Sequence, residues 1–255
     1  MAGPVVDILM YHSISERGGA TSIAPKVFAE QMRAIGESGV KVITLGDYLA
    51  AKDGKTTLPP RSVILTFDDG FQDFAELAWP IMRKLGFRPI VYLPTGYVGR
   101  VEGWPGIANP PRSLMGWDTI RALLSEGVDF GSHSVSHPNL DAVDEERLAD
   151  ELAQSRKVIE TRLDRPVPHF APPYGLAGRN VRSRIATLYA SSVGTRMGRA
   201  GLDSDPLDLP RSEMFYFRDG ARWRAHLAGR ANAYLAKRKI LRAVKGAVMK
   251  PWRGL

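Results

Sequence analysis

The sequence predicts a parallel α/β protein, because short apolar runs alternate with helical patterns along most of its 255 residues. Its composition is that of an ordinary folded protein, with 44% hydrophobic and 24% charged residues, which argues against disorder of the whole chain. The number of strands suits either a barrel or a doubly wound sheet, and periodicity alone does not choose between them. Both architectures place their chemistry at the carboxyl ends of the strands.

Strands are expected where short apolar runs are bounded by polar or turn-forming residues. The first is a buried strand at residues 5–11. The others are expected at residues 40–45, 62–67, 88–93, 128–131, 167–171 and 189–193, with a weaker strand at 207–211. His169 lies inside one of these strands, so we expect it in the core.

Helices are expected between the strands, where apolar residues recur at helical spacing. Phe28, Met32 and Ile35 mark the first. Further helices are expected near residues 47–51, 74–85, 118–126 and 145–163. The last is the strongest, because Leu148, Leu152, Ile159 and Leu163 share one face. Residues 94–113 are rich in Pro and Gly and predict a long loop, a feature that is often functional inside a compact domain.

Charge divides the chain into two unequal parts. Ten of the 35 Lys and Arg residues lie within residues 222–253, where there is no acid, so the rest has 25 basic residues against 27 acidic ones. We therefore expect a catalytic domain over residues 1–219 and a basic, amphipathic helical tail over residues 220–255. His226 is expected to be solvated in that tail. The near-neutral body argues against nucleic-acid binding.

The tail and the N-terminus together suggest a location. A basic amphipathic helix over residues 222–253 could lie on an anionic membrane surface, or it could be a solvated helix packed on the body. The first residues have no basic n-region, and no long apolar stretch follows, so neither a signal peptide nor a transmembrane segment is expected. These features predict a cytoplasmic protein, and the first of the two alternatives for the tail would place it at the inner face of the membrane.

Several polar residues follow directly after expected strands. Asp68 and Asp69 are adjacent carboxylates that repel each other unless a cation or a proton compensates. His133 and His137 are four apart, a common metal-ligand spacing on one face of a helical turn. The chain has no cysteine, so any metal must be held by His, Asp or Glu. Asp69 with the two histidines would leave a position open for water, as in a catalytic site for Zn²⁺, Fe²⁺, Co²⁺ or Ni²⁺.

Three segments carry a resemblance to a known family. Residues 66–70 (TFDDG), 131–140 (GSHSVSHPNL) and 170–175 (FAPPYG) resemble, in order, three motifs of the polysaccharide deacetylases (NodB-homology, carbohydrate esterase family 4). The resemblance implies a distorted (β/α) barrel that removes acetyl groups from glycans. It makes Asp68 the general base and Asp69, His133 and His137 the metal ligands. It places Pro173 and Tyr174 at the substrate, with the Tyr174 N–H directed at the oxyanion.

The chain departs from the family pattern at two points. Ala171 stands where the third motif usually has an Arg, and Arg211 could replace that Arg in space, at the substrate side of the site. The family's C-terminal catalytic His has no counterpart at a strand end. Instead, residues 8–13 (ILMYHS) resemble a subgroup with a permuted motif order, which implies that His12 is the general acid. Trp104 and Trp117 could flank a sugar groove, although packing roles are slightly favoured for both.

The sequence therefore predicts a metal-dependent hydrolase, most simply with Zn²⁺, acting on acetylated sugars of a lipid-linked glycan or an exopolysaccharide. Two alternatives stay open. One is a related metal-dependent hydrolase that cleaves a C–N amide in a substrate other than a glycan. The other is a glycan-binding protein without catalysis, which the change at Ala171 mildly favours.

Overall fold

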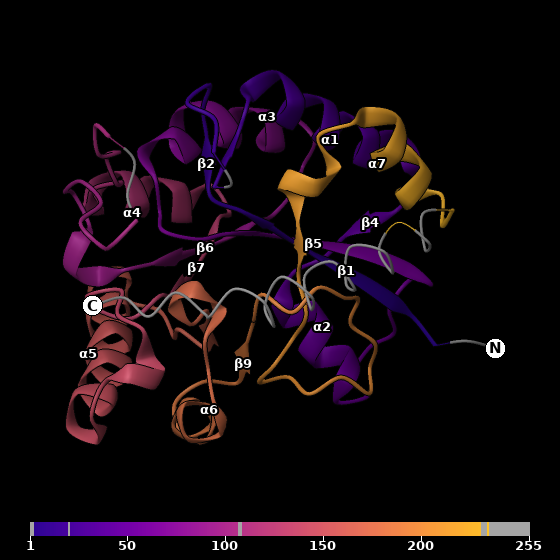
Figure 1. Ribbon diagram of the computed structural model, residues 1–255. Helices are drawn as coiled ribbons and strands as arrows, with labels where there is room; N and C mark the ends of the chain where they lie inside the picture. The colour runs from indigo at the N-terminus through magenta and orange to yellow at the C-terminus, as the bar shows by residue number, and fades with distance from the viewer. Residues whose placement is uncertain (1–2, 20, 107–108, 231–233, 235–255) are drawn as a thin grey trace.

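The computed structural model describes residues 3–19, 21–106, 109–230 and 234, and its centre is a curled parallel sheet (Figure 1). The strands run in the order β10-β1-β5-β6-β7-β8-β9, and β4 pairs beside β5. Their bounds are β1 Val5–Tyr11, β4 Lys41–Val42, β5 Arg61–Phe67, β6 Ile90–Leu93, β7 Asp129–Ser132, β8 His169–Phe170, β9 Ser191–Ser192 and β10 Ser212–Glu213. Two short strands, β2 Ser13–Ile14 and β3 Ser22–Ile23, form a separate parallel pair.

Helices surround the sheet (Figure 1). The α-helices are α1 Pro25–Ser38, α2 Leu45–Lys52, α3 Trp79–Lys84, α4 Trp117–Ser125, α5 Glu145–Leu163, α6 Arg179–Ala186 and α7 Gly220–Leu227. A π-helical turn, η1, covers Phe74–Ala78, and 3₁₀ turns cover η2 Thr95–Tyr97, η3 Leu140–Ala142, η4 Pro173–Gly175 and η5 Met214–Phe217. The predicted α/β class is therefore confirmed, and the sheet curls as a half-barrel.

Both faces of the sheet are buried, which explains why its strands appear as continuous apolar runs in the sequence. In β1, Leu9 and Tyr11 belong to the large cluster of buried side chains that includes α1, α3 and α5. Val6 and Ile8 belong to a smaller cluster that includes α2. The alternation therefore gives each face of the sheet its own buried cluster, with α1, α3 and α5 contributing to one and α2 to the other.

Two expected elements differ from the structure. The expected strand at 207–211 begins in a turn, and within it only Leu209 makes a parallel bridge, to Val193; the paired strand, β10, begins at the next residue, Ser212. The expected helix at 74–85 is present up to Lys84, but its first part, η1, is a π-helical turn, and Pro80 lies in the first turn of the α-helix α3 that follows it. Proline has no N–H to donate to the preceding turn, so it begins a helix more readily than it continues one.

The beginning of the expected basic tail is packed on the domain. Helix α7 contacts α1, and its Trp223 is fully buried. The expectation that His226 is solvated is wrong, because His226 is fully buried and its Nε2 lies 2.9 Å from Asp7 Oδ1 on β1. The rest of the expected tail lies outside the described residues, apart from Tyr234. No helix within the described part of the chain is long and apolar enough to cross a membrane.

Candidate active site

The residues singled out by the sequence meet at one cavity, at the carboxyl ends of the strands. Asp68 and Asp69 follow β5, His12 follows β1, and His133 follows β7. The cavity has a volume of about 390 Å³. It is lined by Met10, His12, Thr21, Asp68, Asp69, Trp104, Pro105, Gly106, Arg112, His133, His137, Tyr174, Gly175, Thr195 and Glu213. Parallel pairing brings these distant segments together because all their strands end at one edge of the sheet.

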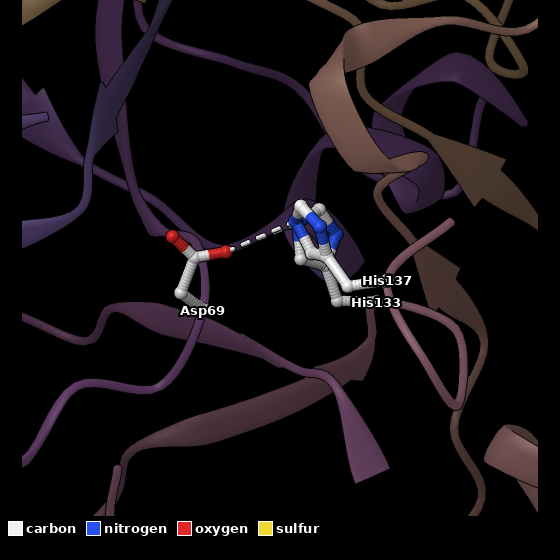
Figure 2. A group of neighbouring side chains, drawn as sticks. All are labelled: Asp69, His133 and His137. Carbon is white, nitrogen blue, oxygen red and sulfur yellow. Dashed lines mark ion pairs between the residues drawn. The ribbon is translucent and has the colours of Figure 1, made fainter. Parts of the chain in front are cut away.

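Asp69, His133 and His137 form a buried three-residue cluster (Figure 2). Asp69 Oδ1 lies 3.4 Å from Nε2 of each histidine. It makes no hydrogen bond within the described part of the chain, although it is buried. An orphaned carboxylate oxygen that faces two imidazole nitrogens is the donor set expected of a divalent metal site with an open position.

The turn that carries the two histidines is not helical, contrary to the expectation from their spacing. Ser134 and His137 both have positive φ angles, of 67° and 55°. His133 is fixed from behind, since its Nδ1–H donates to the Ala171 carbonyl at 2.5 Å. That bond sets the tautomer and leaves Nε2 free to bind a metal. The histidines therefore converge through an irregular turn rather than along one helix face.

Electrostatics in the cluster favour positive charge. Burial alone would raise the pKa of Asp69, but the imidazoles of His133 and His137 outweigh it and hold that pKa well below its usual value. Burial alone would lower the pKa of His133, but the carboxylates of Asp69 and Asp68 raise it overall. Burial dominates at His137 and lowers its pKa. The two carboxylates thus provide a negative environment that suits a cation.

Asp68 has a different environment, because it is paired with Arg211. The guanidinium donates two hydrogen bonds of 2.7 Å, from Nη1 to Oδ1 and from Nη2 to Oδ2. Arg211 is itself fully buried and also donates to the Gly194 carbonyl and to Thr66 Oγ1. Burial alone would raise the pKa of Asp68, but Arg211 outweighs it and the pKa lies below its usual value.

Arg211 thus pairs with Asp68 from a different point in the chain than Ala171, and it does not reach the cavity. It lies behind Asp68 and does not line the cavity, so the expectation of a substrate contact is wrong. The same holds for Pro173, which is buried and absent from the cavity wall. Asp68 and Tyr174, which do line the cavity, are the neighbours of these two residues: Arg211 is hydrogen-bonded to Asp68, and Pro173 precedes Tyr174 in the chain.

His12 lies on the other side of Asp68. Its Nε2 is 3.9 Å from Asp68 Oδ2, and its Nδ1 is buried without a hydrogen bond in the described part of the structure. Glu213 of β10 lines the same cavity. Burial raises the pKa of Glu213, an effect that positive charge at His12 and Arg211 opposes. Glu213 was not found from the sequence, because only the pairing of β10 with β1 brings it to the site.

Aromatic side chains complete the wall around the histidines. Trp104 stacks on His137 with ring centroids 4.3 Å apart, and the Tyr174 ring packs against the same imidazole in a T-shaped arrangement at 4.8 Å. Tyr174 has a positive φ of 59°, and burial, with a smaller effect of Asp69, raises its pKa to about 12. Trp117 is the first residue of α4, and the Arg162 guanidinium of α5 lies over its ring. It is not part of this cavity.

A second cavity of about 300 Å³ adjoins the first. The two share four wall residues, Trp104, Pro105, His137 and Tyr174. The second also contains apolar and polar side chains, among them Tyr97, Val143, Asn139 and Arg147. A ligand larger than one sugar ring could contact both.

Comparison with known proteins agrees with this geometry. The family model "Polysaccharide deacetylase" matches residues 55–193, and the chain belongs to this family. YxkH of Bacillus subtilis (strain 168), whose name places it among the polysaccharide deacetylases, is 24% identical over 207 residues, or 80% of this chain and 69% of that protein. The poly-β-1,6-N-acetyl-D-glucosamine N-deacetylase of Staphylococcus aureus (strain MRSA252) is 24% identical over 179 residues, or 67% of this chain and 59% of that enzyme.

Solved structures share the fold. The deacetylase PplD of Streptococcus pyogenes, in complex with acetate, superposes with a TM-score of 0.72 at 23% identity, covering 82% of this chain and 92% of that one. IcaB from Ammonifex degensii has a TM-score of 0.71 at 23% identity, covering 87% and 97%. The curled half-barrel with its surrounding helices is therefore the architecture of known deacetylases.

Proposed function

We propose that this protein is a metal-dependent N-deacetylase that removes acetyl groups from N-acetylated sugars of an oligo- or polysaccharide. The observation that carries the proposal is that two adjacent carboxylates in one cavity have different partners. Asp69 faces the two histidines, whereas Asp68 is paired with Arg211 and faces His12. Such a separation gives one carboxylate to a metal and leaves the other for proton transfer.

Asp69, His133 and His137 would hold the metal. Their nitrogen and oxygen donors suit Zn²⁺, with Co²⁺, Ni²⁺ and Fe²⁺ as alternatives. When bound, the ion would act as a Lewis acid on the acetyl carbonyl and favour deprotonation of the attacking water. The buried, orphaned oxygen of Asp69 supports this assignment.

Asp68 would be the general base that takes the proton from the attacking water. Arg211 lowers the pKa of Asp68 below its usual value, so the carboxylate is ionised at neutral pH and ready to accept a proton. Its geometry is fixed by the two hydrogen bonds from Arg211. The base is therefore both charged and oriented before the substrate arrives.

Tyr174 and His12 would act on the two ends of the scissile amide. The backbone N–H of Tyr174 would donate to the oxyanion, an interaction worth about 3 kcal/mol for one such donor. Protonated His12 would donate to the leaving nitrogen, and Glu213 in the same cavity would stabilise its positive charge. This role for His12 is the one implied by the subgroup with an N-terminal catalytic His. The products are acetate and a free amino sugar.

The substrate class rests on the relatives and on the shape of the site. Several relatives bear the name poly-β-1,6-N-acetyl-D-glucosamine N-deacetylase, although the chain spans 11% of the Escherichia coli (strain K12) protein and 59% of the staphylococcal one. The two adjoining cavities would accept more than one sugar ring. We therefore expect an oligosaccharide to be a better substrate than a single N-acetylated sugar.

The test is acetate release by metal-stripped protein, with and without added Zn²⁺ or Co²⁺. The substrates are N-acetylglucosamine itself and its dimers and tetramers, in either β-1,6 or β-1,4 linkage. Metal-dependent release that rises with chain length is expected. Release from a simple acetylated amide but from no sugar would replace the proposal with an amide hydrolase of another substrate class. No release with either metal, together with glycan binding, would indicate a binding protein.

A further inference from the structure

A buried carboxylate lies directly behind the turn that joins the two histidines. Glu151 lies on α5, does not line the cavity, and is only 5% exposed. Its Oε2 accepts hydrogen bonds from the backbone N–H groups of Val135, at 2.8 Å, and Ser136, at 2.9 Å. The Ser136 hydroxyl donates to Oε1. Three donors of one short turn therefore converge on a single side chain that is not part of the cavity wall.

The turn needs such support because its backbone is in an unfavourable conformation. Ser134 and His137, which flank the residues bonded to Glu151, have φ angles of 67° and 55°. A non-glycine residue in the left-handed region costs on the order of 1 kcal/mol or more and persists only where its surroundings enforce it. The flanking bonds, from His137 N–H to Ser134 Oγ and from Gly96 N–H to the Val135 carbonyl, belong to the same enforcement.

The charge of Glu151 matters as well as its position. A carboxylate accepts all three hydrogen bonds, whereas a glutamine amide has a single accepting oxygen, so its NH₂ group would face either the two N–H donors or the Ser136 hydroxyl, which would then have to accept instead of donate. Hydrogen bonds to an ionised acceptor are about twice as strong as neutral ones. Arg147 Nε lies 3.8 Å from Oε1, but its side chain is 57% exposed, so this surface pair adds little.

We propose that Glu151 is a positioning residue for the metal site. It holds the 133–137 turn in the shape that directs His133 and His137 at Asp69. The inference rests on the proposed function, because it takes these three residues as the metal ligands. A preorganised metal site loses less binding free energy to reorganisation when the metal binds. Removal of a group that orients a metal ligand by hydrogen bonding typically weakens metal affinity about 10–100-fold.

The experiment is a Zn²⁺ titration of metal-stripped full-length protein against a chromophoric chelator. Glu151→Gln is compared with the wild type and with Glu160→Gln. Glu160 is a matched control because it lies on the same helix, and its carboxylate also accepts a backbone N–H, that of Val167, at 3.0 Å. Thermal unfolding of each metal-free variant is recorded to separate loss of fold from loss of affinity.

The expected result is a 10–100-fold rise in the Zn²⁺ dissociation constant for Glu151→Gln and an unchanged constant for Glu160→Gln. Equal affinities of Glu151→Gln and the wild type would overturn the proposal, as would an equal loss in both variants. If Glu151→Gln does not fold, Ser136→Ala removes one of the three bonds, and a loss of a few fold in affinity is expected. Failure of the wild type itself to bind Zn²⁺, Co²⁺ or Ni²⁺ would instead overturn the proposed metal site, and with it this inference.

Discussion

At the scale of single residues, the chemistry of the site depends on giving two neighbouring aspartates opposite surroundings. Asp68 and Asp69 are adjacent in the chain, yet one is bound by Arg211 and the other faces two histidines. The positive φ of Asp69, 74°, turns the backbone between them. Gly70, with a φ of 69°, continues the turn, and glycine allows that conformation without steric cost. Adjacent side chains can therefore serve different purposes.

Asp68→Asn removes the proposed base without removing a metal ligand. We expect turnover to fall by at least about 100-fold, the smaller end of what general-base catalysis contributes. Zn²⁺ affinity should remain close to that of the wild type, because Asp69 and both histidines are unchanged. Acetate release and a chelator titration measure the two quantities separately. Near-normal turnover in this variant would mean that another group takes the proton.

Arg211→Lys tests how Arg211 sets the pKa of Asp68, the proposed base. Arg211 holds the pKa of Asp68 below its usual value, and lysine cannot form the bidentate pair. The folded-state pKa of Asp68 should therefore rise, and activity, which needs the ionised carboxylate, should be lost at a higher pH than in the wild type. The acid limb of kcat/KM against pH measures the shift. Arg199→Lys, which changes an ion pair to Asp7 instead, should leave that limb in place.

At the scale of elements, a buried ion pair holds the described parts of the long loop, residues 94–106 and 109–113. Glu102 and Arg112 form a buried pair in which Nε and Nη2 of Arg112 each donate at 2.8 Å. The Arg112 guanidinium also lies 4.0 Å from the centroid of the Phe71 ring. Between them in the chain, Trp104 stacks on His137. The pair therefore holds the loop that places the Trp104 ring beside His137, one of the proposed metal ligands.

Glu102→Gln would leave Arg112 as an uncompensated buried charge. Breaking a buried pair in this way typically costs about 3–5 kcal/mol, so we expect a lower midpoint of thermal unfolding and faster amide hydrogen exchange in residues 97–106. Glu145→Gln, which breaks an exposed pair with Arg184, serves as the control and should change neither measurement. Unchanged exchange in Glu102→Gln would show that packing alone holds the loop.

Sequence patterns located most elements but misjudged short or interrupted ones. The strand at residues 5–11 and the helix at residues 145–163 were predicted to the residue. Helix α6 was missed because only Val181 and Ile185 are buried along it, too few to show a period. The π-helical turn before Pro80 and the shift of β10 depend on hydrogen bonding in the folded chain, which a pattern of apolar residues does not record.

At the scale of the whole molecule, a buried polar network joins the C-terminal helix α7 to the first strand. Asp7 on β1 lies 2.9 Å from His226 Nε2, 3.2 Å from Arg199 Nε and 3.5 Å from Arg61 Nη2. Burial alone would raise the pKa of Asp7, but His226 and the two arginines outweigh it and lower that pKa. The network helps to attach α7 to the sheet, at the end of β1 opposite His12.

Asp7→Asn should destabilise the protein, because it leaves the largely buried guanidinium groups of Arg61 and Arg199 without their anion. A cost of about 3–5 kcal/mol corresponds to a fall in Tm on the order of 10 °C for a domain of this size. Since the folded-state pKa of Asp7 is lowered from 3.8, its stabilisation is fully present above that value and is lost as the pH falls through the folded-state pKa. The difference in Tm between variant and wild type should therefore shrink in acid, and an equal difference at pH 3 and pH 7 would contradict this account.

The expectation that residues 222–253 lie on an anionic membrane stays a prediction, because most of that segment is outside the described residues. Replacing Lys237, Arg238 and Lys239 by Gln should reduce co-sedimentation with vesicles that contain anionic lipid, since each basic residue near such a surface contributes about 1 kcal/mol. Vesicles of neutral lipid are the control. Equal sedimentation of variant and wild type with anionic vesicles would remove the proposed role of the tail.

The sequence alone determined the α/β class, the positions of the long elements and the family, because these depend on local periodicity and on contiguous motifs. It also supplied Asp68, Asp69, His133 and His137 as the residues that carry chemistry. Only the tertiary structure decided what surrounds them: that Arg211 supports Asp68 from behind, that Glu213 reaches the cavity and that Glu151 holds the histidine turn. Arg211 lies 143 residues from Asp68 in the sequence, and Glu213 is brought beside Met10 of β1, so only the pairing and packing of strands and helices places such partners at the site.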